Sequence, residues 1–451
     1  MHLAQVARAV NGELRGVDVP LRGVATDTRA DCDGRLFVAL RGDNFDAHDF
    51  VVQAQHKGAA AAMLERGIDI QIPTVRVADT RQALMDLAAW WRAQFVIPVV
   101  GVTGSVGKTS VKEMLGRIFA EVGNGLVTHG NLNNEIGVPL TLLRLVEGDQ
   151  YAIVEMGMNH AGEISRLSNI TKPTIALINN AAAAHLEDLG TVEAVARAKG
   201  EIFEGLSDDG VAVINADDKF ASMWRDLAGD RCIITFGLQQ ADITGSYELM
   251  PQSVRLDVVA KGKRLQVEMP VIGEHNVRNA LAAIAVASAA NIPPKLIRRG
   301  LELYRPIGGR LTLHQFETAT VLDDTYNANP ASMQAAVDAL VRYDNCTLIV
   351  GDMAELGDAA ESAHLELGKY ARDKGVDRLM ACGEFSQLVA QGFGDNARAF
   401  KAQIDLIEEL QQLGTPKGAI LVKGSRSARM ERVVKMLMQI LQNNTEVKNA
   451  C

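Results

Sequence analysis

Hydrophobic and polar positions along the first quarter of the chain alternate between strand-like and helix-like patterns. Short apolar runs at residues 36–40 and 74–77 predict strands, with short helical stretches and turns between them. Residues 81–94 repeat their apolar side chains at helical spacing, and the predicted helix leads into a strand at 96–100. Beyond residue 109, apolar positions recur at the spacing of one helix face. The pattern therefore predicts strand, loop and helix in that order.

The middle of the chain continues this alternation. Strands are predicted at residues 151–156, 174–179 and 211–215, separated by helices such as 191–206, and this order favours a mostly parallel sheet covered on both faces. Between residues 232 and 269 the apolar period changes to two, which predicts an appended antiparallel hairpin. A helix is predicted at 276–290, and its apolar run is too short to cross a membrane.

The last third of the chain has a second set of alternating elements. Strands are predicted from residue 321 and at 347–350, 378–381 and 419–422, with helices between them, which indicates another doubly wound sheet. Gly308 and Gly309 before it are typical of a hinge.

Between the strand at 96–100 and its helix, residues 102–109 read VTGSVGKT. Glycines let consecutive backbone N–H groups face an anion, Lys108 can reach the β and γ phosphates, and the Thr109 hydroxyl can hold Mg²⁺. The strict P-loop pattern has glycine where this chain has Val102, so the spacing is a variant. The segment predicts binding of ATP or GTP.

A chain of 451 residues is too long for one core. We expect an α/β protein of three domains. They are a small N-terminal α/β domain at 1–80, a central P-loop domain at 81–310 with a mostly parallel sheet and an antiparallel extension, and a C-terminal Rossmann-like domain at 311–451.

Composition narrows the classes of partner. The chain has 46 Lys and Arg against 55 Asp and Glu, a net charge of −9, which argues against nucleic acid as the main partner. Five scattered cysteines without a Cys-x-x-Cys pair support neither a disulfide framework nor a zinc site. The start lacks the pattern of a signal peptide, and no apolar run approaches the ~18 residues of a membrane span. We expect a cytoplasmic protein without membrane insertion.

Three polar residues stand out after the P-loop. Glu155 ends an apolar strand, where it can reach Mg²⁺ or remain a solvated strand-end carboxylate. His185 follows the next strand; such a histidine is more often structural, but beside Glu155 and Lys108 it becomes a candidate metal ligand. Lys199, from composition alone, is a solvated lysine on an amphipathic helix.

Other polar groups are placed to bind a substrate. Residues 131–134 read NLNN and suit hydrogen bonding to a peptide or sugar, or capping of a loop. Arg310 at the hinge and residues 324–329, DTYNAN, lie where a second domain can close over a nucleotide.

These segments together resemble the Mur ligases, the ADP-forming amide ligases of peptidoglycan synthesis. The resemblance runs from residues 26–29 almost to the C-terminus and includes residues 103–109, 130–134, 155–157, 179–180, 185, 198–201, 275–280, 309–310, 324–329 and 421–427. The P-loop variant is shared with folylpolyglutamate synthetases. The combination of residues 324–329 with GDMAELG at 351–357 is more specific to the member that adds D-Ala-D-Ala. The chain lacks the Asp-Asn-Pro-Arg signature of the diaminopimelate-adding relative.

The resemblance implies a reaction and its site residues. ATP would phosphorylate the C-terminal carboxylate of UDP-MurNAc-tripeptide, and the amine of D-Ala-D-Ala would attack the acyl phosphate. Lys199 would be carbamylated and would hold Mg²⁺ with Thr109, Glu155 and His185, while Lys108 would be catalytic. The implied nucleotide-binding residues are Thr103, Gly104, Ser105, Gly107, Lys108, Thr109, Ser110, His275, Asn279, Arg310 and Asp324. The implied substrate-binding residues are Thr28 and Arg29 for the uridine diphosphate end, with Asn131, Asn134, Tyr326, Asn327, Asn329, Lys423, Ser425 and Arg426.

Alternatives remain at this stage. Within enzymes they are another Mur ligase step or a folylpolyglutamate-type ligase. Outside enzymes the alternative is a nucleotide-operated switch, in which ATP changes a domain angle without forming a bond. A kinase that stops at phosphoryl transfer is a weaker alternative, because the third domain would then have no evident function. We expect a monomer.

Overall fold

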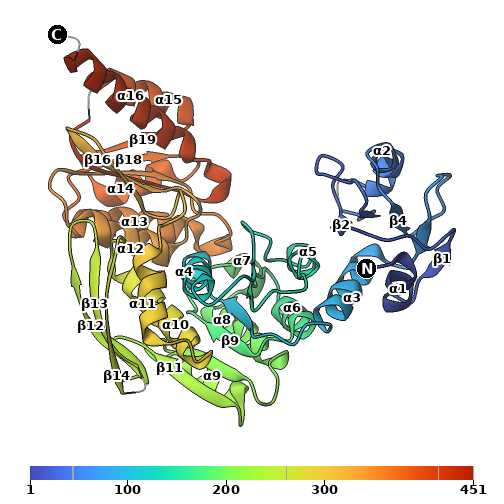
Figure 1. Cartoon of the computed structure of the whole chain (residues 1–451). Coiled ribbons are helices and arrows are strands. Elements are labelled where there is room, and N and C mark those ends of the chain that lie inside the picture. The colour runs from blue at the N-terminus through green and yellow to red at the C-terminus, as the bar shows by residue number, and fades with distance from the viewer. Residues whose placement is uncertain (43–44, 261, 415, 450–451) are drawn as a thin grey trace.

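The computed structural model describes residues 1–42, 45–260, 262–414 and 416–449, which form three α/β units in chain order (Figure 1). We call them the N-terminal unit (residues 3–76), the central unit (80–303) and the C-terminal unit (312–449). The predicted α/β class, with its three sheets, is confirmed. The predicted domain boundaries at 80/81 and 310/311 stay predictions.

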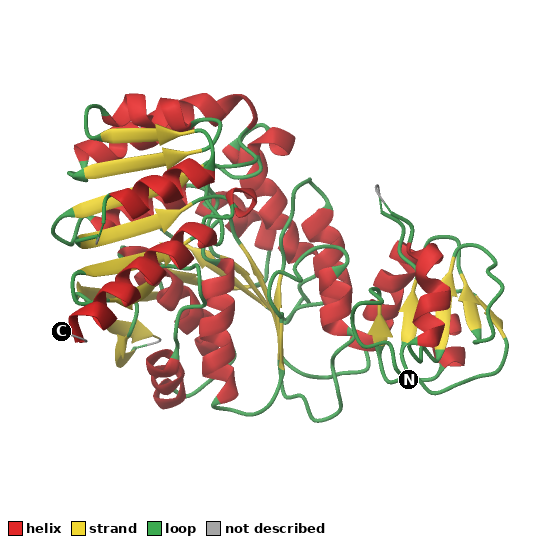
Figure 2. Ribbon diagram, turned by 90° about the horizontal axis from the view of Figure 1, so that it is seen from above, coloured by secondary structure: helices red, strands yellow, loops and turns green. Residues whose placement is uncertain are grey.

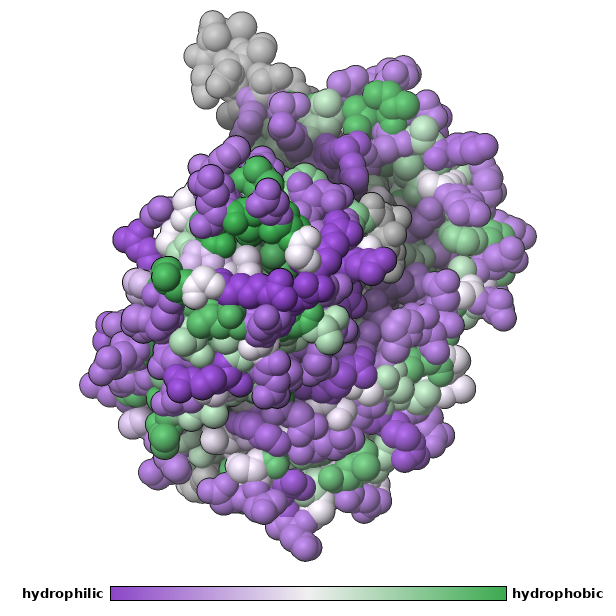
Figure 3. Space-filling model, turned by 90° about the vertical axis from the view of Figure 1, so that its right-hand side faces the viewer, coloured by the Kyte–Doolittle hydropathy of each residue, from purple (hydrophilic) through white to green (hydrophobic). Residues whose placement is uncertain are grey.

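The N-terminal unit is a small sheet with few helices. Its strand order is β1-β5-β4-β3-β2, in which only the β1–β5 pair is antiparallel. The elements are α1 (Leu3–Ala9), β1 (Glu13–Arg15), β2 (Val24–Ala25), β3 (Leu36–Val38), α2 (Val51–His56), β4 (Ala61–Leu64) and β5 (Thr74–Arg76). Figure 3 views this side of the molecule and shows its hydrophobic patches broken up by polar residues.

Helix α3 (Thr80–Arg92) joins the N-terminal unit to the central one. Asp79 begins it by accepting hydrogen bonds from the backbone N–H groups of Arg81 and Gln82. At its other end the buried Arg92 guanidinium donates to the carbonyls of Thr171 and Lys172. These bonds fasten the connecting helix to the central unit.

The central unit is built on nine strands in the order β14-β13-β12-β11-β10-β9-β6-β8-β7. Its strands are β6 (Val99–Thr103), β7 (Leu126–Val127), β8 (Ala152–Glu155), β9 (Ile175–Ile178), β10 (Val211–Asn215), β11 (Cys232–Phe236), β12 (Ile243–Leu249), β13 (Val254–Ala260) and β14 (Lys263–Met269). Its helices are α3, α4 (Lys108–Ala120), α5 (Gly137–Leu142), α6 (Glu163–Thr171), α7 (Leu186–Leu189), α8 (Val192–Gly200), α9 (Ala221–Ala228), α10 (Glu274–Ala289) and α11 (Pro294–Leu303).

Two apolar layers enclose the parallel part of this sheet. Alternate residues of β6 face opposite layers: Val99 packs in the core with α6 and α8, whereas Val100 and Val102 pack in the core with α4 and α10. Helix α10 is buried along most of its length, which explains the apolar run near residue 281. In the part of the chain that the structure describes, no helix has the length and apolar character needed to cross a bilayer.

The predicted antiparallel extension is present, but it begins later than expected. Strand β11 pairs parallel with β10, so it extends the parallel sheet, and only β12, β13 and β14 pair antiparallel. The burial pattern gives the reason. β11 ends in three consecutive buried residues, whereas β13 alternates buried and exposed positions, as a strand with one solvated face does.

Two further element ends differ from the prediction. β6 starts at Val99 rather than at residue 96, because Val96 is fully exposed. Helix α8 ends at Gly200 rather than continuing to residue 206, and a 3₁₀ turn follows at Glu201–Glu204. The Glu201 carboxylate accepts hydrogen bonds from the backbone N–H groups of Gly162 and Ser165 at the start of α6.

The C-terminal unit is a six-stranded sheet with helices on both faces, as Figure 2 shows. Its order is β15-β16-β20-β17-β18-β19, and only β15 and β16 pair antiparallel. The elements are β15 (Thr312–Gln315), β16 (Ala319–Asp324), α12 (Pro330–Leu340), β17 (Cys346–Gly351), α13 (Ala360–Asp373), β18 (Arg378–Cys382), α14 (Ser386–Phe393), β19 (Ala397–Phe400), α15 (Gln403–Gln412), β20 (Gly418–Lys423) and α16 (Glu431–Asn449). The sequence pattern did not predict β15 and β19, because these edge strands contain no fully buried residue and so lack a hydrophobic signal.

Helices α13 and α14 pack so closely that glycine is required at their contact. A Cβ atom on Gly368 would lie 2.1 Å from the carbonyl oxygen of Val389. We expect Gly368→Ala to destabilise the C-terminal unit by about 2 kcal/mol or more, because backbone atoms cannot move aside. Calorimetric melting measures the effect.

Gly116→Ala is the matched control within helix α4. The nearest atom to its added Cβ would be 3.5 Å away, so alanine should be neutral or stabilising by up to about 1 kcal/mol. Equal melting temperatures for Gly368→Ala and the parent chain would contradict the close packing.

Candidate functional site

The loop between β6 and α4 is held in shape by asparagines that follow β9. The backbone N–H of Val106 donates to Asn180 Oδ1 at 2.9 Å, and the Val106 carbonyl accepts from the side-chain amides of Asn179 and Asn180. Gly107 begins α4 with φ +81, in the left-handed region. The backbone of the loop is therefore fixed before any phosphate is bound.

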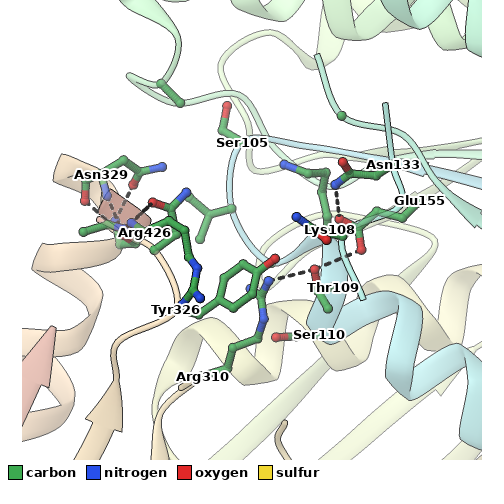
Figure 4. Close-up of a pocket in the computed structure, with 18 of the residues that line it drawn as sticks. Ser105, Lys108, Thr109, Ser110, Asn133, Glu155, Arg310, Tyr326, Asn329 and Arg426 are labelled. Atoms are coloured by element: carbon green, nitrogen blue, oxygen red, sulfur yellow. Dashed lines mark hydrogen bonds between the residues drawn. The ribbon is translucent and has the colours of Figure 1, made fainter. Parts of the chain in front are cut away.

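Ser105 lies on this loop, and Lys108 begins helix α4 directly after it (Figure 4). The Lys108 amine donates to the Gly104 carbonyl at 2.5 Å, so its side chain folds back over the loop. Burial lowers the pKa of Lys108. The Ser105 hydroxyl exchanges hydrogen bonds with the backbone of Ala182, on the segment that leads to His185.

A connected set of polar groups surrounds Thr109. Its hydroxyl donates to Glu155 Oε2 at 2.9 Å, and the Asn133 amide donates to Glu155 Oε1 at 2.8 Å. Arg310, in the segment before the C-terminal unit, donates to the Thr109 hydroxyl oxygen at 2.8 Å (Figure 4). Glu155 is only 2% exposed, so the interpretation as a solvated strand-end carboxylate is wrong.

Lys199 lies in the interior, at 1% exposed on helix α8, and its interpretation as a solvated lysine is therefore also wrong. Burial, and to a smaller extent the charge of Lys108, hold the pKa of the Lys199 amine well below its usual range. Burial of the charged form is unfavourable, so the neutral amine is favoured. The sequence pattern missed this because a helical period does not show which face a neighbouring helix covers.

His185 lies where the central and C-terminal units meet. It precedes α7 with φ +56, and its Nδ1 atom lies 2.8 Å from Glu355 Oε2 of the C-terminal unit. This buried nitrogen makes no hydrogen bond of normal geometry. The neighbouring His185 ring holds the pKa of the Glu355 carboxyl below its usual range.

Two residues of α10 approach the loop from the other side. Asn279 Oδ1 accepts from Asn179 Nδ2 at 3.0 Å, which ties α10 to the asparagines that shape the loop. Burial lowers the pKa of His275, so the neutral imidazole is favoured.

The C-terminal unit adds a second set of polar groups. The buried Lys423 amine donates to Asp324 Oδ2 at 2.6 Å and to the Asn327 carbonyl at 2.9 Å. The Arg310 guanidinium carbon lies 4.0 Å from the ring centre of Tyr326. Asn329 caps helix α12 through Ser332. The Asp324 carboxylate therefore compensates the charge of the buried Lys423 amine.

One cavity of about 610 Å³ brings most of the predicted residues together. Those that line it are Ser105, Gly107, Lys108, Thr109, Ser110, Asn131, Asn134, Glu155, His185, His275, Asn279, Arg310, Asp324, Tyr326, Asn327, Asn329, Lys423 and Arg426. Thr103, Gly104, Lys199 and Ser425 are not among the lining residues, and Thr28 and Arg29 belong to the N-terminal unit.

Several lining residues were not singled out individually as site residues in the sequence prediction. They are Arg81, Asn133, Glu135, Asn159, Glu163 and Glu355. Asn133 stood within the NLNN run and Glu355 within the GDMAELG run, so a local signal existed for both. The others come from helices and loops whose meeting depends on the tertiary fold.

Comparisons with known proteins agree with this architecture. Residues 102–287 match the Mur ligase middle domain, and residues 309–426 match the family described as "Mur ligase, glutamate ligase domain". The chain is 44% identical over 447 residues to UDP-N-acetylmuramoyl-tripeptide--D-alanyl-D-alanine ligase of Escherichia coli K12, covering 97% of this chain and 98% of the relative.

Solved structures with a similar fold are ligases of the same kind. A crystal structure of MurF from Acinetobacter baumannii has a TM-score of 0.92 at 37% identity, covering 97% of this chain and 98% of that one. MurF ligase of Thermotoga maritima in complex with ADP has a TM-score of 0.83 at 26% identity, covering 94% and 98% of the two chains.

The site predicts that Gly107 tolerates no side chain. A Cβ atom there would lie 2.3 Å from Asn279 Oδ1 and 2.7 Å from Asn179 Nδ2, at a positive φ. We expect Gly107→Ala to weaken ATP binding by about tenfold or more, because strain and displaced asparagines change the loop. Isothermal titration calorimetry measures this affinity.

Gly375→Ala is the control, since Gly375 has φ +89 with no atom within 4 Å of an added Cβ. Alanine at position 375 introduces backbone strain without a steric clash, so this variant should bind ATP with the affinity of the parent chain. Parent-like ATP affinity in Gly107→Ala would show that the loop is not shaped by these asparagines.

Proposed function

The chain belongs to the Mur ligase family, and from this premise we propose that it joins D-alanyl-D-alanine to UDP-N-acetylmuramoyl-tripeptide with cleavage of ATP to ADP and phosphate. The relative from Escherichia coli carries the name of this ligase, and this chain matches it over nearly its whole length. The observation that carries the chemistry is the shared cavity, which unites the P-loop with polar groups of the C-terminal unit. The Thermotoga maritima relative in complex with ADP supports nucleotide binding.

The first step activates a carboxylate. A carboxylate oxygen of the tripeptide attacks the γ-phosphorus of ATP, the bond from phosphorus to the bridging oxygen breaks, and ADP leaves with that electron pair. This transfer brings anionic oxygens together. Lys108 at the start of α4 and Arg310 beside Thr109 are placed to offset the repulsion, because a cation held at the reacting phosphate stabilises developing negative charge.

We propose that Mg²⁺ is held by Thr109, Glu155, His185 and a carbamylated Lys199. The Thr109 hydroxyl and the Glu155 carboxylate already meet, and the buried Nδ1 of His185 makes no hydrogen bond of normal geometry. Within the described ranges no three His, Cys, Asp or Glu side chains converge. A carbamate on Lys199 would supply the missing oxygen ligand, and its formation requires the neutral amine that burial favours. Bound Mg²⁺ supplies charge stabilisation to the phosphate oxygens.

The second step forms the amide bond. The amine of the dipeptide attacks the carbonyl carbon of the acyl phosphate, the bond from that carbon to the phosphate oxygen breaks, and phosphate leaves while the nitrogen loses a proton. Among the candidates for receiving the dipeptide, Asn327, Asn329 and Arg426 line the cavity. Lys423 is paired with Asp324, and we assign it to positioning the loop after β16.

The rest of the substrate assignment also stays a proposal. The Asn131 and Asn134 side chains line the cavity on the central side, where the peptide would pass. Thr28 and Arg29 remain the candidates for the uridine diphosphate end, and the Arg29 side chain is exposed. Ser425 lies buried against Ser427, so its predicted substrate contact requires a rearrangement. The predicted monomeric state and cytoplasmic location stay predictions.

The reaction predicts strict dependence on both substrates. We expect the protein to release phosphate from ATP at its full rate only with UDP-MurNAc-tripeptide and D-Ala-D-Ala together, because the acyl phosphate is consumed by the amine. Mass spectrometry should show a product equal to the two substrates minus one water. Equal phosphate release without the dipeptide would contradict amide formation, and a product from folate and glutamate would favour the folylpolyglutamate-type alternative.

The proposed metal site predicts chemical rescue. We expect Lys199→Ala to lose ligase activity by about a hundredfold or more, since a carboxylate-like ligand would be missing. Added short-chain carboxylic acids should restore part of the activity by filling the vacated space. Lys219→Ala, which removes an exposed lysine, is the control and should keep parent activity. A Lys199→Ala variant that folds normally and retains parent activity would contradict carbamylation.

A further inference from the structure

Five acidic side chains line the cavity, and four of them are held by other groups. Glu155 is bound by Thr109 and Asn133, and Asp324 by Lys423 and the backbone N–H of Leu311. Glu163 accepts from the backbone N–H of Asn159 at 2.7 Å, and Glu135 pairs with Arg166. Among these five carboxylates, Glu355 is the one that is not held in this way.

The Glu355 side chain is 55% exposed in this cavity, and its contact with His185 is not a hydrogen bond of normal geometry, since His185 Nδ1 has no hydrogen-bond partner among the described residues. Its nearest ring neighbour is His185, whose Nδ1 atom lies 2.8 Å from Glu355 Oε2. The carboxylate therefore has oxygen atoms open to a ligand that enters the cavity.

The loop that carries Glu355 is fixed to the C-terminal unit by the two residues that directly follow β17. The Asp352 carboxylate accepts from the backbone N–H groups of Glu384 and Phe385. His364 Nε2 accepts from the backbone N–H of Met353 at 2.9 Å, and its ring stacks on Phe385 at 4.5 Å. Glu355 itself has φ +62, a conformation that persists only where the surroundings impose it. Its carboxylate is thus presented to the cavity by a preorganised loop.

The chemistry of the cavity leaves one substrate group without a partner. Lys108 and Arg310 suit the phosphates, and the asparagines suit uncharged peptide groups. The incoming dipeptide, however, arrives mainly as an ammonium ion, which requires a carboxylate. Glu355 is the lining carboxylate with open capacity, and it comes from the unit proposed to receive the dipeptide.

We propose that Glu355 binds the ammonium group of the acceptor dipeptide and holds it next to the carboxyl group that ATP activates. This role rests on the proposed function and adds a residue that determines specificity for an acceptor with a free amino terminus. Contact with the substrate, rather than the contact with His185, is then the main task of the side chain.

Steady-state kinetics of Glu355→Gln tests the role. We expect KM for D-Ala-D-Ala to rise by about tenfold or more, because glutamine keeps the shape but removes the charge. KM for ATP should change less than about twofold, the scatter expected for a residue outside the nucleotide contacts. Glu355→Asp should recover part of the dipeptide affinity. Glu361→Gln, which removes an exposed carboxylate on α13 outside the cavity, is the control and should behave as the parent chain.

A second measurement separates substrate binding from a structural role, in which the contact between Glu355 and His185 holds the central and C-terminal units together. N-acetyl-D-Ala-D-Ala lacks the positive charge, so its inhibition constant should be the same for Glu355→Gln and the parent chain. Calorimetric titration of both dipeptides with ADP and UDP-MurNAc-tripeptide present gives the same comparison if turnover is lost. Equal weakening of both dipeptides, or an unchanged affinity for D-Ala-D-Ala, would overturn the role of Glu355. Absence of any ligated product from the parent chain would instead refute the proposed function.

Discussion

The site depends on the position of β6 between β8 and β9 in the central sheet. All three strands are parallel, so their carboxyl ends meet at one edge. The register places Val102 opposite Glu155 and Thr103 opposite Ile178. The loop that leaves β6 therefore starts between the carboxylate that ends β8 and the asparagines that follow β9. A shift of register by one residue would turn Glu155 to the opposite face of the sheet.

Charges at this edge are compensated within the protein, with a few exceptions. Glu155 is satisfied by Thr109 and Asn133, and Lys423 by Asp324. The exceptions are the imidazole Nδ1 of His185, which is buried without a hydrogen-bond partner among the described residues, and the Glu355 carboxylate, which is 55% exposed in the cavity. An unpaired buried polar group is unfavourable, so its retention is typical of a functional site. His185 and Glu355 therefore lie where metal and substrate are proposed to bind.

The cavity belongs to neither unit alone. Arg310 reaches Thr109 across 201 residues of sequence, and His185 meets Glu355 across the junction of the central and C-terminal units. Away from the cavity, Tyr343 of the C-terminal unit donates to the carbonyl of Pro251, between β12 and β13. The antiparallel extension thus contacts the C-terminal unit and links it to the central unit at a second place. A cavity lined by both units suits a ligase, because an acyl phosphate must react with an amine before water reaches it.

Local sequence determined the parts of this protein that depend on neighbouring residues in the chain. Apolar runs that alternate with helical stretches predicted the parallel strands. The glycines with Lys108 and Thr109 predicted the loop, because its shape is set by few consecutive residues. The edge strands β15 and β19 were missed because they bury too little to leave a periodic signal. Tertiary structure alone decided that Lys199 is buried, that β11 joins the parallel sheet, and that Glu355 faces His185. Each of these three features depends on packing against residues far away in the sequence. The spacing of apolar residues within one helix or strand does not show which distant element packs against it.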